Sequence, residues 1–108
     1  MKFRDQRVSK LIREELSKII ARELEFENAL VTITEVETDK KLEIAKVRIS
    51  VLPAEKTEEV FKTLDLARNN LQTIIFKKLN MRPTPKIKFE IDRGLENAAE
   101  VEKLLLEE

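Results

Sequence analysis

Cysteine and histidine are both absent from this chain of 108 residues. Without cysteine there can be no disulfide bond and no thiolate metal site. Without histidine the commonest proton shuttle and transition-metal ligand is missing. The three serines do not stand in a G-x-S-x-G turn, and the carboxylate pairs Glu14–Glu15 and Glu58–Glu59 fall in helical patterns that are typical of a solvated face. We therefore predict that the protein is not an enzyme and has no cofactor and no metal site.

Long apolar runs are lacking as well. No stretch approaches the roughly 18 residues that span a bilayer, and the N-terminal MKFRDQRVSK has no signal-peptide core. We expect a cytoplasmic protein with no membrane partner and no small-molecule substrate. The hydrophobic content of 42% predicts a packed core, and the length predicts a single domain over residues 1–108. Nothing in the sequence demands more than a monomer.

Charge is balanced overall but is distributed unevenly. The chain has 21 basic and 21 acidic residues, yet the stretch 66–88 holds six basic residues and no acidic one. The stretch 96–108 holds five Glu against one Lys. The first stretch predicts an electropositive surface, and the second predicts an acidic end.

The hydrophobic pattern predicts an alternation of helices and strands. The expected elements are a helix over 5–24, strands over 31–37 and 42–52 joined by a hairpin at 39–41, a long helix that Thr57 caps and Pro83 stops, a strand over 85–92, and an amphipathic helix over 95–106 that follows Gly94. This order predicts an α+β fold of two layers, in which helices cover one face of a three-stranded sheet. Because a helix connects the second and third strands, we expect these two strands to be parallel.

The apolar residues of the first two strands change face partway along. Val31 and Ile33 share a face, but Val36 lies on the other. In the second strand the change falls between Ile44 and Val47. Because the two changes lie opposite each other across the hairpin, we predict a matched bulge or a sharp local twist.

The stretch LARNNLQ places Asn69 and Asn70 side by side in the middle of the long helix. Asn is a weak helix former, because its amide competes for nearby backbone hydrogen bonds. After Gly it is the residue that best tolerates a left-handed backbone. In a chain with a single Gly, two adjacent Asn residues predict a deliberate break or kink of the helix.

The exposed face of this helix suits a nucleic-acid backbone. It carries amides, a hydroxyl, a ring and a cation, and a break would also expose backbone N–H groups to a phosphate. The predicted binding residues are Arg68, Asn69, Asn70, Lys77, Lys78, Arg82, Lys86 and Lys88. A secondary basic cluster consists of Arg4, Arg7 and Lys10. The ordinary interpretation of these three residues is a solvated surface that binds no RNA. From the residues alone, an ordinary solvated surface remains the alternative.

Three stretches carry a resemblance to a known family. They are QRVSKLIREELSKII, LEIAKVRISVL and LARNNLQTIIFKKLNMRPTPKIKFEID. The element order is that of a type II KH domain, and over nearly its full length the chain resembles the bacterial ribosome-binding factor A family. That family replaces the KH G-x-x-G loop with an interrupted helix marked by Ala-x-Gly. Here Ala67-Arg68-Asn69 stands at that place, with Asn instead of Gly.

The resemblance implies a non-enzymatic ribosome assembly factor. Such a factor binds the small ribosomal subunit and its ribosomal RNA, assists late maturation of the subunit and rRNA processing, and matters for growth in the cold. It implies that Ala67, Arg68 and Asn69 mark the helix interruption and that the predicted binding residues contact RNA. The loop LEFENAL is shorter than is usual in the family and lacks an Asp-Pro-Arg-like turn, so we assign no RNA contact to it.

The alternative function is a KH-like module for protein–protein interaction that does not bind RNA. It would be marked by an exposed apolar patch, with Leu66 and Phe76 as candidates, and by binding that is indifferent to salt.

Overall fold

The computed structural model describes residues 4–81 and 84–92. Its elements are α1 (Arg4–Glu23), β1 (Leu30–Thr38), β2 (Ile44–Leu52), the short 3₁₀ helix η1 (Ala54–Lys56), α2 (Thr57–Leu79) and β3 (Lys86–Ile91). This order confirms the predicted succession of helix, two strands, helix and strand. The helix predicted over 95–106, together with Gly94, lies outside the described residues.

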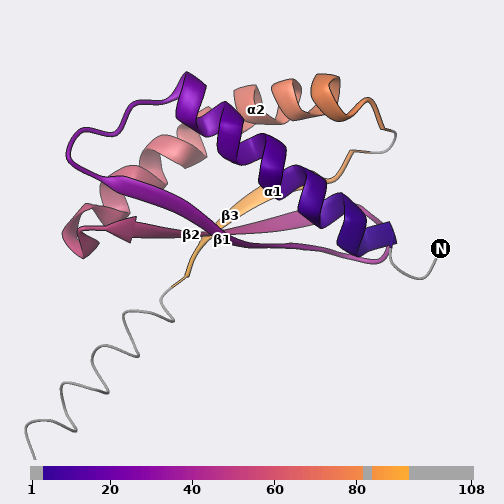
Figure 1. Cartoon of the computed structure of the whole chain (residues 1–108), viewed down its shortest axis with the longest axis horizontal. Helices are drawn as coiled ribbons and strands as arrows, with labels where there is room; N and C mark the ends of the chain where they lie inside the picture. The colour runs from indigo at the N-terminus through magenta and orange to yellow at the C-terminus, as the bar shows by residue number, and fades with distance from the viewer. Residues whose placement is uncertain (1–3, 82–83, 93–108) are drawn as a thin grey trace, which may run out of the picture.

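The sheet has the strand order β1-β2-β3, with β2 in the centre. Strand β1 is antiparallel to β2, and β3 is parallel to it, as the helical connection predicted. Figure 1 shows α1 and α2 on the same side of the sheet, so the fold is the expected two-layer α+β arrangement. The other side of the sheet is an open face, covered by neither of these helices.

The core lies between the two helices and the covered face of the sheet. Strand β2 contributes Ala45, Val47, Ile49 and Val51, at every second position, as a strand with one buried face requires. Each helix adds an apolar stripe; the fully buried members include Ile12, Leu16, Leu64, Leu71 and Ile75. Burying each large side chain stabilises the fold by about 1.5–3 kcal/mol, so this layer of contacts fixes how both helices lie on the sheet. Within the described ranges, no helix is both long and apolar enough to cross a membrane.

Only one of the two predicted phase changes is a bulge. Ile33 pairs with Ile49 and Glu35 pairs with Arg48, so Thr34 is the extra residue in β1. Strand β2 is regular throughout, and the prediction of a matched irregularity in it is wrong. The apparent slip arose because Ile44 is an apolar residue on the exposed face of a regular strand, with 44% of its surface exposed. Leu42, which is buried, lies in the turn before β2 with a positive φ of 59°.

Both predicted boundaries of the long helix are displaced. Lys56, rather than Thr57, is the residue before the first helical position, and the Thr57 hydroxyl donates to the Ala54 carbonyl at 2.6 Å. At the other end the helix stops at Asn80, which has φ 48° and ψ 43° and donates its N–H to the Phe76 carbonyl at 3.1 Å. A left-handed residue at this position is a common helix stop. The helix has therefore ended before the chain reaches Pro83.

The hairpin between β1 and β2 depends on one carboxylate. Oδ1 of Asp39 accepts hydrogen bonds from the backbone N–H groups of Glu43, at 2.7 Å, and Ile44, at 3.1 Å. We expect Asp39→Ala to lower the free energy of unfolding by about 1 kcal/mol, because exposed capping bonds of this kind contribute about that much. Denaturant unfolding measures the loss, and Lys40→Ala is the control that keeps the turn length. An Asp39→Ala variant as stable as Lys40→Ala would contradict this role.

Candidate nucleic-acid interface

Helix α2 runs without interruption through the Asn pair. Asn69 and Asn70 are exposed, and within the described ranges the non-glycine residues with positive φ are Asn28, Leu42 and Asn80. Neither Asn of the pair therefore has the left-handed backbone that a break at this place would use, and in this part of the chain it is Asn80, directly after α2, that takes this conformation.

The axis of α2 nevertheless changes direction near the middle of the helix, as Figure 1 shows. The Thr73 hydroxyl donates to the Asn69 carbonyl at 3.1 Å. Such a bond to the carbonyl four residues earlier competes with the helical bond and bends helices. The α2 helix is thus bent rather than broken. The residues around the Asn pair remain part of the helix, so a break does not expose their backbone N–H groups. That Ala67, Arg68 and Asn69 mark the place of the family's helix interruption stays a prediction.

A second residue in this part of α2, Gln72, was not predicted from the sequence. Its Oε1 accepts from the Ile87 N–H at 2.7 Å, and its Nε2 donates to the Pro85 carbonyl at 2.9 Å. The amide thus acts as one more strand partner for the start of β3 and ties the bent part of α2 to the sheet. The only sign of this role in the sequence was the position of Gln72 beside the apolar stripe of the helix. Many solvated glutamines have the same position, so the role could not be predicted.

The cations of α2 lie at two places. Arg68 is exposed and pairs with Asp65 at 3.8 Å. Lys77 and Lys78 occupy the last turn, where the helix dipole favours positive charge. Both are exposed, and neither forms an ion pair within the described residues. The end of α2 therefore presents two adjacent positive charges that no carboxylate in the described ranges neutralises.

The remaining predicted cations do not share the α2 surface. Ile87 and Phe89 are buried under the helices, so the alternating residues Lys86 and Lys88 point to the open face. Arg82 lies outside the described residues. The predicted set is thus divided between the helix layer and the opposite face of the sheet.

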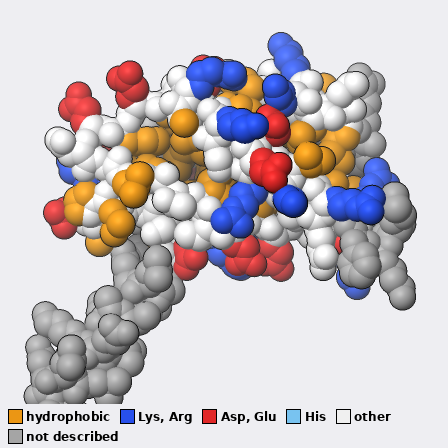
Figure 2. Space-filling view, viewed as in Figure 1, with side chains coloured by type: hydrophobic (Ala, Val, Ile, Leu, Met, Phe, Trp, Pro, Cys, Tyr) orange, Lys and Arg blue, Asp and Glu red, His pale blue; other side chains and the backbone are white. Residues whose placement is uncertain are grey.

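The secondary basic cluster lies on α1. Arg4, Arg7 and Lys10 are exposed in the first half of that helix. In Figure 2, Lys and Arg side chains are spread over the face on which α1 lies, with Asp and Glu side chains between them. This mixture is typical of a solvated helix face and favours the ordinary interpretation of the cluster.

The open face carries a charge network that the sequence did not indicate. Arg48 contacts Glu35, Glu37 at 3.3 Å and Glu90 at 3.6 Å, so it links all three strands. The hydrogen bond with Glu35, followed by the charge of the same carboxylate, raises the pKa of Arg48 above its ordinary value.

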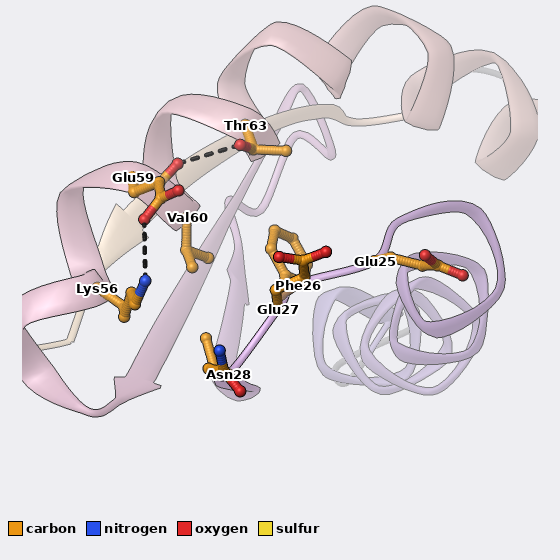
Figure 3. A pocket seen from close by; sticks show the side chains of 9 residues that line it. Glu25, Phe26, Glu27, Asn28, Lys56, Glu59, Val60 and Thr63 are labelled. Atoms are coloured by element: carbon orange, nitrogen blue, oxygen red, sulfur yellow. Dashed lines mark hydrogen bonds and ion pairs between the residues drawn. The ribbon is translucent and has the colours of Figure 1, made fainter.

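Two hollows on the described surface are not lined mainly by cations, unlike the end of α2. One, of about 340 Å³, lies between the loop before β1 and the start of α2, and Glu25, Glu27 and Glu59 line it together with Lys56 (Figure 3). Lys56 pairs with Glu59 at 3.7 Å, so the lining repels phosphate. Within the described ranges no group of three or more His, Cys, Asp or Glu side chains could hold a metal ion.

The second hollow is apolar and lies between α1 and β1. It has a volume of about 540 Å³ and is lined by Ile20, Leu24, Phe26 and Val31, among others, with Arg13 at its side. Figure 2 shows hydrophobic side chains gathered in this hollow.

The apolar patch that would mark a protein-interaction module is not formed by the predicted residues. Leu66 is 80% exposed and Phe76 is 41% exposed, but ten positions along a helix place them about 15 Å apart. Single exposed apolar side chains are ordinary on soluble proteins.

Comparison with known proteins places the chain in a family. The profile of the ribosome-binding factor A family matches residues 4–105. The ribosome-binding factor A of Caldanaerobacter subterraneus is 34% identical over 99% of this chain and 90% of its own length. That of Clostridium perfringens is also 34% identical, over 95% of this chain and 92% of its own length.

Solved structures agree in fold. The crystal structure of ribosome-binding factor A from Thermus thermophilus has a TM-score of 0.67 at 20% identity and covers 81% of this chain and 94% of its own. A homology model of the Thermus thermophilus factor, fitted into the cryo-EM map of a 30S–RbfA complex, has a TM-score of 0.69 at 22% identity and covers 79% of this chain and 91% of its own. With family profile, sequence identity and fold in agreement, this chain belongs to the ribosome-binding factor A family.

Proposed function

We propose that the chain binds the small ribosomal subunit through its ribosomal RNA and assists late maturation of the subunit, including rRNA processing, without catalysing a reaction. Membership of the family supports this function, and so does the relative that is placed in a map of a 30S complex. In this role the protein acts in the cytoplasm as a monomer and supports growth in the cold.

The observation that carries the RNA contact is the end of α2. Lys77 and Lys78 are exposed, adjacent and without an ion pair in the described ranges. An unneutralised cation at a helix surface gains most from a phosphate, because binding releases the counterions that RNA holds. The exposed amides of Asn69 and Asn70 lie about two turns earlier on the same helix and add hydrogen-bond donors and acceptors. The arrangement can hold an RNA backbone and offers no group for bond-making chemistry.

Binding of the purified protein to small ribosomal subunits at several salt concentrations tests this function. We expect a clear affinity that falls steeply with salt, by roughly a thousandfold between about 50 and 200 mM if about six phosphates are contacted. Binding that salt does not change would instead support the protein-interaction module, for which the apolar hollow between α1 and β1 is the favourable observation. The absence of any binding would contradict the proposed function.

A further inference from the structure

The open face of the sheet carries its own row of cations. Lys46 of β2 and Lys88 of β3 are aligned neighbours across the parallel pair, and Lys86 lies two residues before Lys88 on the same face. All three side chains are exposed. Aligned residues on adjacent strands lie about 5 Å apart, so these three residues, here called the open-face lysines, form one compact positive strip.

Three carboxylates of this face, those of Glu35, Glu37 and Glu90, contact Arg48 rather than the open-face lysines, and a fourth, that of Asp92 directly after β3, accepts a hydrogen bond from the Thr34 hydroxyl at 2.7 Å. Glu37 is aligned with Lys46, yet its Oε2 lies 3.3 Å from Nη2 of Arg48. Glu90, two residues after Lys88, also contacts Arg48, at 3.6 Å. In the part of the chain that the structure describes, no ion pair involves an open-face lysine. Because aligned like charges destabilise a sheet, this strip gains when an anion lies across it.

The strip and the end of α2 face in different directions. Helix α2 packs on the covered side of the sheet, whereas the open-face lysines leave the sheet on the other side. A polyanion is the partner that charge complementarity selects, because the spacing of the lysines follows a strand and they are not gathered around a pocket that would enclose a small anion.

We propose that the open-face lysines bind a second segment of RNA backbone, distinct from the segment at the end of α2, so that the protein bridges two parts of the ribosomal RNA. This inference rests on the proposed function for the identity of the RNA. A factor that holds two rRNA segments at once fixes their relative position, which is a physical way to assist folding of a subunit without chemistry.

Single introduced cysteines test the bridge directly, because these 108 residues contain no cysteine. Ile44→Cys, next to Lys86 on the open face, and Thr73→Cys, on α2, each carry a tethered hydroxyl-radical probe in the complex with the small subunit. We expect the two probes to cleave two different rRNA segments, and a probe at Glu58→Cys, in the first turn of α2, to cleave neither strongly. The inference is overturned if the Ile44→Cys probe cleaves no rRNA or if both probes cleave the same segment.

Charge removal provides a second readout. Lys46→Gln combined with Lys88→Gln is compared with Lys18→Gln combined with Lys62→Gln, which removes the same charge from α1 and α2 outside both surfaces. We expect the first pair to lower the slope of log affinity against log salt by about two and to weaken binding about tenfold at physiological salt. The control pair is expected to change the affinity less than about twofold.

The outcomes separate this inference from the proposed function. If the wild-type protein binds with steep salt dependence but the two pairs of variants behave alike, the second RNA site is wrong and the proposed function stands. If the open-face pair weakens binding and the Ile44→Cys probe cleaves no rRNA, a protein of the subunit covers the strip and the RNA assignment is overturned. If the wild-type protein does not bind the subunit, both proposals fail.

Discussion

Reversing the charge of Lys77 and Lys78 together, by Lys77→Glu with Lys78→Glu, is expected to weaken binding to the small ribosomal subunit by about a hundredfold at physiological salt. Both side chains are exposed in the last turn of α2 and have no ion-pair partner in the described ranges. Each substitution removes an attraction to phosphate and adds a repulsion. The measurement is the dissociation constant for purified subunits at two or more salt concentrations.

The control must separate charge from folding. Carboxylates at a helix C-terminus oppose the dipole and cost about 0.3–1 kcal/mol each, so the thermal stability of the variant is measured alongside binding. Lys18→Glu with Lys62→Glu makes the same change of net charge at exposed positions away from the surface and is expected to bind nearly as the wild type does. Lys77→Gln with Lys78→Gln should fall between the two. Unchanged affinity in the reversed variant would show that the end of α2 does not contact the RNA.

Replacing Gln72 by Ala is expected to lower the free energy of unfolding by about 2 kcal/mol, because it removes two part-buried hydrogen bonds that each contribute about 0.5–1.5 kcal/mol. The substitution removes the acceptor of the Ile87 N–H and the donor to the Pro85 carbonyl, and both of those residues are buried. For a domain of this size the loss corresponds to a fall in Tm of roughly 10 °C. Thermal and denaturant unfolding measure it.

Thr73→Ala is the matched control for Gln72. It changes the next residue of the same helix, whose hydroxyl bonds only within α2, to the Asn69 carbonyl. We expect it to change stability by less than about 0.5 kcal/mol. If Gln72→Ala costs no more than Thr73→Ala, the side-chain amide does not hold β3 to the helix. A large cost in Gln72→Ala would also predict weaker subunit binding, because the amide ties to β3 the part of α2 that carries the exposed Asn pair.

The positions of the strands and helices could be predicted because hydrophobic periodicity is local. The spacing of apolar residues indicated the buried stripe of α2 as Val60, Leu64, Ala67, Leu71, Ile74 and Ile75. Four of these residues are buried, and Ala67 and Ile74 are half-buried. The alternation around Ile87 and Phe89 similarly indicated a strand with one buried face. Such patterns depend only on the repeat of a helix or strand, so they can be recognised without knowing the fold.

The irregular points were predicted less well, because each depends on a residue distant in the sequence. The bulge at Thr34 exists only relative to its partner strand β2. The long helix stops at Asn80, while Asn69, the same residue type, stays helical in a segment held to β3 by Gln72. Local propensity is the same at both positions, so it could not indicate which of the two residues would leave the helix.

The sequence by itself determined the element order, the buried faces, the absence of cysteine and histidine chemistry, and the family to which the chain belongs, since composition, periodicity and motif order are properties of the chain alone. Only the tertiary structure decided how the basic stretch 66–88 is divided. The alternation of β3 sends Lys86 and Lys88 to the open face, whereas Lys77 and Lys78 stay in the helix layer. It also decided that Arg48 forms ion pairs with Glu35, Glu37 and Glu90 on that face. The physical reason is that the sequence gives the order of the charged residues, whereas the packing of strands and helices decides which of them lie on the same surface.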